Sequence, residues 1–136
     1  MDDFRQVIDL GQLTADDTVT LARTAAEAIR GLNWATQSSA GLGQPSVAYD
    51  VIGALSAAAS RLGQALRQIT SYLDSAAAAG LLGCDRGDDP AHAVAAAGTF
   101  LDDARLSAAA LAGDLDAACQ HLALISARPT SRKDQP

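Results

Sequence analysis

Apolar residues recur at alternating spacings of three and four along two long stretches of the chain. In the first stretch, about 46–79, they are Ile52, Leu55, Ala59, Leu62, Leu66, Ile69, Leu73 and Ala76. In the second, about 90–126, they are Val94, Ala97, Leu101, Ala104, Ala108, Leu111, Leu115, Ala118, Leu122 and Ile125. This heptad spacing is typical of helices that pack along their length, as in coiled coils. We therefore expect two long helices, with the mid-helix residues Leu66 and Leu111 deeply buried.

The segment between the two stretches has clear helix-boundary chemistry. Gly80 suits the left-handed position that ends a helix, and Asp89-Pro90 gives an N-cap residue followed by proline at the first helical position. Because the connection is short and the two helices are similar in length, an antiparallel pair is expected.

A third amphipathic pattern precedes the other two. Thr14 and Asp17 have the spacing of a capping box, and a helix is predicted over about 14–37. The small residues of 38–45, which end in proline, predict a loop. Residues 3–10 could form a short N-terminal helix. The sequence thus predicts an all-α fold, an antiparallel bundle of three long helices in one domain over 1–127, with a disordered tail over 128–136.

Composition agrees with this fold and restricts the function. Hydrophobic residues make up 49% of the chain and aromatic residues 4%, which favours helices over strands. The net charge of −6 argues against direct binding to nucleic acid or to an anionic membrane surface. No apolar run approaches the ~20 residues of a membrane span. The acidic N-terminus does not resemble a signal peptide, so a cytoplasmic location is expected.

The few residues that could carry chemistry lack partners at the required spacing. Asp89 and His92 have the separation found in carboxylate-bridged metal bundles, but no second motif of this kind follows. Cys84 lies near Arg86 with no base placed beside it, and Cys119 is expected to be a packing residue. We therefore predict no catalytic residue, no metal site and no cofactor.

Two groups of residues are candidates for binding. A second apolar row on the last helix could form an oligomer or partner interface, or could be alanines exposed to solvent; it consists of Leu106, Ala110, Gly113, Ala117 and Leu124. A second group, made of aromatic and polar residues, could line a ligand pocket or could fill a wide layer of the core; it consists of Asn33, Trp34, Tyr49, Asp50 and Tyr72.

The motif Asn33-Trp34-Ala35-Thr36, the segment 41–55 and the segment 89–94 resemble small alanine-rich helical proteins of actinomycetes. The resemblance covers about residues 30–125 and implies a bacterial habitat but no activity, since none is assigned to that group. A weaker likeness is to the secreted helical hairpins of the WXG100 type. In that family a Trp-x-Gly turn joins two helices, whereas here Trp34-Ala35-Thr36 precedes a nine-residue loop. The WXG100-type export signal is also missing after the last helix.

These observations favour a non-enzymatic interaction or scaffold module. It would self-associate as a homo-oligomer, such as a dimer, or bind a protein partner. The alternatives are a ligand-binding or enzymatic bundle with a pocket near Trp34 and Tyr49, and a secreted WXG100-like protein.

Overall fold

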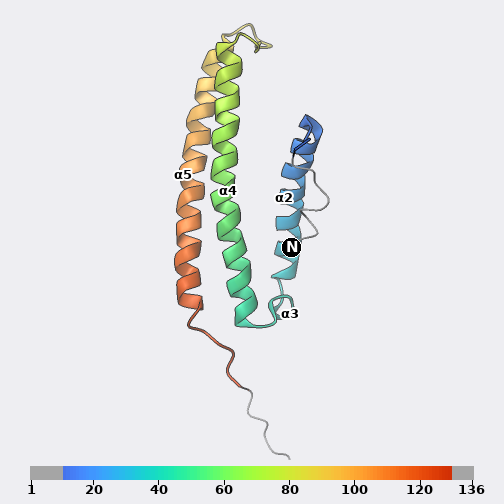
Figure 1. Ribbon diagram of the computed structural model, residues 1–136, viewed down its shortest axis with the longest axis vertical. Coiled ribbons are helices and arrows are strands. Elements are labelled where there is room, and N and C mark those ends of the chain that lie inside the picture. Colours follow the sequence, from blue (N-terminus) through green and yellow to red (C-terminus); the bar gives the residue numbers. More distant parts are fainter. Residues whose placement is uncertain (1–10, 130–136) are drawn as a thin grey trace, which may run out of the picture. The chain divides into compact units, whose positions relative to one another are not determined.

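The structure is a computed structural model of the 136-residue chain and describes residues 11–129. Within these residues the chain forms helices and no strands, so the all-α prediction is confirmed. The helices are α2 (Ala15–Ala35), α3 (Ser39–Leu42), α4 (Pro45–Ala78) and α5 (Pro90–Leu122), shown in Figure 1. The three long helices match the three predicted ones, although α5 ends four residues before the expected end at 126. The possible helix over 3–10 and the tail from 130 onward lie outside the described residues.

The chain divides into two compact units, Met1–Gly43 and Gln44–Pro136. The first contains α2 and α3, and the second contains α4 and α5. The single three-helix domain expected over 1–127 stays a prediction.

In the first unit, α2 begins with the predicted capping box. The Thr14 hydroxyl accepts a hydrogen bond from the backbone N–H of Asp17 at 3.2 Å, and the Asp17 carboxylate accepts one from the backbone N–H of Thr14 at 2.9 Å. These two bonds satisfy amides that have no partner within the helix. No residue of α2 is buried.

The segment predicted as a loop over 38–45 contains a single helical turn, α3. Its last residue is followed by Gly43, whose φ of 70° lies in the left-handed region and ends the turn. Gly41 passes so close to α2 that an added Cβ would lie 1.8 Å from the carbonyl oxygen of Ala35. A turn this short has no periodicity, so the hydrophobic pattern could not predict it.

In the second unit, the connection between α4 and α5 has the predicted boundary chemistry. Gly80, with φ of 69°, follows the C-cap, and its N–H donates to Ala77 while the N–H of Leu81 donates to Ala76. These two bonds form a Schellman motif. At the start of α5, the Asp89 carboxylate accepts a hydrogen bond from the N–H of Ala91 at 3.0 Å.

Helices α4 and α5 pack against each other along their length in antiparallel directions (Figure 1). The register of the two helices is given by residue pairs in contact, in which the residue number falls along α4 as it rises along α5. From the loop end to the open end, the pairs in contact are Thr70 with Gly98, Gly63 with Arg105, Ser56 with Ala112, and Tyr49 with Cys119.

The line of closest approach between α4 and α5 consists mostly of small residues. The buried side chains of these two helices are Ser56, Ala59, Ala76, Ala108 and Ala112. The expected deep burial of Leu111 is wrong, because 52% of this residue is exposed, and Leu66 is only half-buried. The predicted heptad positions lie mostly beside the contact line. Small residues occupy that line because they let the two backbones come close.

Candidate functional site

The two sides of the α4–α5 pair differ in character. On one side, polar side chains surround a groove of about 380 Å³ with a floor of small residues, which we name the polar groove. Its polar lining residues are Ser60, Gln64 and Arg67 of α4 and Arg105 and Asp116 of α5. Its floor is formed by Ala59, Gly63, Ala109, Ala112 and Gly113.

Neighbouring groups partly balance the charges of the polar groove. The Arg105 guanidinium is 3.3 Å from the Asp102 carboxylate, an ion pair between exposed groups that contributes little to stability. The Asp116 carboxylate accepts a hydrogen bond of 2.5 Å from the hydroxyl of Ser56, which is buried between the helices. The sequence pattern did not identify this groove. In the sequence, the groove corresponds to the polar residues Ser60, Gln64 and Arg67, which follow helical spacing beside Gly63. The same spacing is expected of any row of polar residues that faces solvent.

The other side of the pair is an apolar face. We define it by Leu55, Leu62, Leu66, Ile69 and Leu73 of α4 and by Ala97, Phe100, Leu101, Ala104, Leu111, Leu115, Ala118 and Leu122 of α5. Several of these side chains are exposed, including Leu62 at 51%, Ile69 at 49%, Leu111 at 52% and Phe100 at 75%. Most of the residues that the sequence assigned to two heptad patterns therefore lie together on one surface.

Helix geometry explains why the heptad residues of α4 and those of α5 lie on the same side of the helix pair. Successive residues are rotated by about 100°, so residues just before and just after a contact position lie on opposite sides of the contact line. Ser60 and Gly113 follow Ala59 and Ala112 and line the groove. Leu62 and Leu111 precede Gly63 and Ala112, so they lie on the other side. Because the helices are antiparallel, residues that precede contact positions on both helices share one side of the pair.

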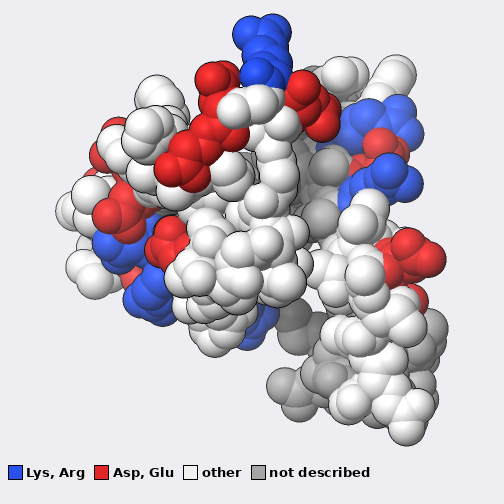
Figure 2. Space-filling view, turned by 90° about the horizontal axis from the view of Figure 1, so that it is seen from above, with Lys and Arg blue, Asp and Glu red and all other residues white. Residues whose placement is uncertain are grey.

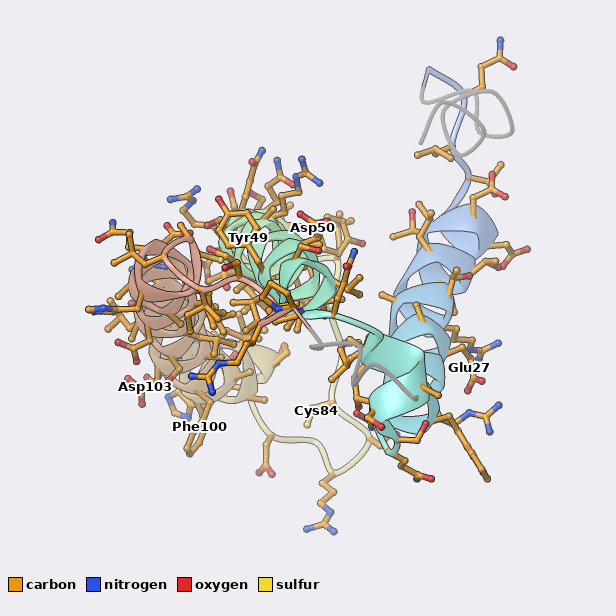
Figure 3. All side chains as sticks on the ribbon, turned by 90° about the horizontal axis from the view of Figure 1, so that it is seen from below. Glu27, Tyr49, Asp50, Cys84, Phe100 and Asp103 are labelled. Atoms are coloured by element: carbon orange, nitrogen blue, oxygen red, sulfur yellow. The ribbon has the colours of Figure 1, made fainter. Side chains whose placement is uncertain are left out.

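The apolar face contains no charged residue among those that define it. In Figure 3 Phe100 and Asp50 lie on opposite sides of the α4–α5 pair, and Asp103 points away from α4. These two charged side chains therefore lie outside the apolar face. Figure 2, which views the loop end, shows acidic and basic side chains next to one another rather than a surface of one sign.

The predicted interface row lies on α5 but not on the apolar face. Leu106, Ala110, Gly113 and Ala117 are all exposed and follow the outer side of α5 near the polar groove, which Gly113 lines. Leu124 lies beyond the last residue of α5, Leu122, and is 86% exposed. The structure therefore keeps four of the five residues on one helix surface.

The predicted pocket residues are not brought together within the second unit. Tyr49 and Asp50 lie in the first turns of α4 (Figure 3), whereas Tyr72 is roughly 35 Å farther along the same helix at 1.5 Å per residue. Asn33 and Trp34 belong to α2, in the other unit. None of these residues lines the polar groove.

A second groove lies at the loop end, where its lining includes Cys84, Asp88, Asp89 and His92. The Asp89 carboxylate caps α5, as described above, and Cys84 is a half-buried free thiol. Within residues 11–129, no three or more His, Cys, Asp or Glu side chains are grouped so that they could hold a metal ion.

Among the helices described, none contains a segment of the length and apolar character needed to cross a bilayer. Comparison with protein-family models, curated proteins and solved structures finds no match to the chain. The resemblances to the actinomycete group and to the WXG100 type therefore stay predictions.

Proposed function

We propose that this protein is a non-enzymatic helical interaction module, and that its binding surface is the apolar face of α4 and α5. The observation that carries the proposal is that leucine and isoleucine side chains of both helices are about half exposed on one uncharged surface. Contiguous apolar surface of this kind typically marks a site of protein association. Scattered single leucines would have no such meaning.

The free energy available at this face supports the proposal. Burying apolar surface contributes roughly 25 cal/mol per Å², so fully covering a half-exposed leucine contributes about 1 kcal/mol. The face offers three such aliphatic side chains, Leu62, Ile69 and Leu111, together with the more exposed Phe100. The small residues buried between α4 and α5 contribute far less each than leucines would. Covering the face would therefore add hydrophobic stabilisation that the hairpin alone does not obtain from its exposed side chains.

We further infer a cytoplasmic location, which the two free cysteines support. In this compartment Cys84 and Cys119 would stay reduced.

The proposal can be tested with a photo-crosslinking phenylalanine analogue introduced at single positions in the host cells. The face positions are Leu62, Ile69 and Leu111, and the matched controls are Arg61 and Asp103, which lie on the same helices but off the face. We expect protein adducts at the face positions and few at the controls. Equal adduct yields at all positions, or none at the face positions, would contradict the proposal.

A further inference from the structure

Resting on the proposed function, we propose that the occupant of the apolar face is a second copy of this chain. The two α4–α5 pairs pack face to face around a two-fold axis parallel to the helices, and α4 of each copy lies against α5 of the other. Every neighbouring pair of helices in this four-helix assembly is antiparallel, as in the commonest bundles. An interface of this type is isologous, because the same surface is used by both copies.

The register of the hairpin makes the apolar face self-complementary. Gly63 of α4 is level with Arg105 of α5, and Ser56 is level with Ala112. In this register the α4 row Leu55–Leu73 is level with about residues 95–113 of α5, so it lies beside the first two thirds of the row Ala97–Leu122. A two-fold axis parallel to the helices preserves these levels, so the α4 row of each copy overlaps the α5 row of the other copy along nearly its whole length.

At two levels of the proposed interface, a large side chain of α4 has a small face residue of α5 close to its level. At the level of Leu62 on α4, the face of α5 carries the small residue Ala104. At the level of Ile69 it carries Ala97. Placing large side chains opposite small ones lets facing helices interdigitate.

The area of the face is sufficient for a stable dimer. The two rows are roughly 30–40 Å long at 1.5 Å per residue, and two packed helices are roughly 18 Å wide. The face is therefore about 600 Å² in each copy, or about 1,200 Å² in total, which reaches the range of specific interfaces.

The charge distribution also suits a second copy. The chain has a net charge of −6, so two copies repel each other over most orientations. The residues that define the apolar face are uncharged, and the acidic residues of α5, such as Asp102 and Asp103, lie outside it. Face-to-face packing thus keeps like charges on the outside of the assembly.

The decisive experiment measures the molar mass of the full chain by size-exclusion chromatography with light scattering, between about 1 and 100 μM, where dimers of modest affinity dissociate. We expect a dimer for the wild-type chain. Leu62→Gln and Leu111→Gln should raise the dissociation constant about tenfold or more, because each change occurs twice in a symmetric dimer. Leu106→Gln is the matched control, since Leu106 is an exposed leucine of α5 outside the face, and it should leave the dimer intact.

Disulfide trapping tests the arrangement separately from any folding defect. In a Cys84→Ser, Cys119→Ala background, a chain carrying Leu62→Cys and one carrying Ala104→Cys should form a mixed disulfide when combined, faster than either forms a disulfide with itself.

A wild-type monomer over the whole concentration range overturns the inference. So does a dimer that Leu106→Gln dissociates and Leu62→Gln does not. If a monomer still gives adducts to another protein at Leu62 in host cells, this inference fails and the proposed function stands.

Discussion

At the scale of single residues, Ser56 is the side chain that most restricts how α4 and α5 can pair. Among the described residues, Ser56 is the polar residue that is buried, with 4% of its surface exposed. Its hydroxyl lies 2.5 Å from an Asp116 carboxylate oxygen and 3.1 Å from the carbonyl oxygen of Ala112. A hydroxyl has only one proton to donate, and the charged carboxylate is the stronger acceptor, so the Ser56 hydroxyl donates to Asp116. A shift of the helices by one turn would break both of these contacts between α4 and α5.

We therefore expect Ser56→Ala to lower the free energy of unfolding by about 1 kcal/mol, the typical net contribution of such a hydrogen bond. Urea denaturation followed by circular dichroism measures this change. Ser60→Ala is the control, because Ser60 is exposed in the polar groove and its loss should change stability by less than about 0.5 kcal/mol. Equal effects of the two substitutions would show that the buried hydrogen bond does not fix the pairing.

The capping box at the start of α2 makes a second prediction at this scale. The backbone N–H of Thr14, and then its hydroxyl, donate to the Asp17 carboxylate and hold the pKa of Asp17 below its ordinary value of 3.8. A lowered pKa in the folded state means that the charged form stabilises the helix above the ordinary pKa. This contribution is lost as the pH falls through the folded-state pKa.

The helix content of α2 should therefore decrease as the pH falls below the ordinary aspartate pKa of 3.8 and through the lowered pKa of Asp17 in the wild-type chain. In Asp17→Asn this part of the decrease should be absent, whereas Asp16→Asn leaves the capping box intact and should retain it. Amide chemical shifts of residues 15–20, followed by NMR during an acid titration, report the change. Identical titration of the two variants would contradict the assigned cap.

At the scale of helices, two glycines of the first unit should respond to alanine in opposite ways. Gly31 lies inside α2, and no atom outside its own stretch of helix backbone lies within 4 Å of the position that a Cβ would occupy there, so Gly31→Ala should stabilise the helix by about 0.5–1 kcal/mol. Gly41→Ala would place a methyl group 1.8 Å from the Ala35 carbonyl oxygen and should unfold α3. Hydrogen exchange of the amides in both helices measures these effects. Faster exchange in Gly31→Ala, or unchanged exchange of α3 in Gly41→Ala, would be the contrary result.

Local sequence signals predicted the helices and their ends, because their physical causes are local. Thr14, Gly80 and Asp89 act on amides and carbonyls within a few residues, and the structure confirms all three. The side of each helix that faces its neighbour depends on distant residues. Leu62 and Gly63 repeat with the same period and differ by one position, so periodicity cannot distinguish a helix that buries its leucines from one that buries its small residues.

The same reasoning explains which binding surfaces could be predicted. The heptad rows identified most residues of the apolar face, but as an internal core. The polar groove was not predicted, because Ser60 and Arg67 become a lining only when α5 lies beside them. The aromatic group that includes Tyr49 and Tyr72 was chosen by residue type alone, and the length of α4 separates these two residues.

At the scale of the whole molecule, association through the apolar face links stability to concentration. A dimer gains stability with protein concentration by mass action, whereas a monomer does not. The melting temperature of the wild-type chain should therefore rise over a hundredfold increase in concentration. Leu111→Ala should lower it and weaken this dependence, and Leu106→Ala should preserve the dependence. Differential scanning calorimetry at several concentrations tests this expectation, which a concentration-independent melting temperature would refute.

The line of small residues between α4 and α5 also has an evolutionary consequence. A larger side chain at Ala59 or Ala112 would separate the two backbones and displace both rows of the apolar face at once. At Leu62 or Ile69, another aliphatic side chain of similar size would fit. Descendants of this sequence should therefore exchange leucine, isoleucine and methionine freely along the apolar face. They should keep alanine, glycine or serine at the buried contacts, so that selection acts most strongly where the side chains are smallest.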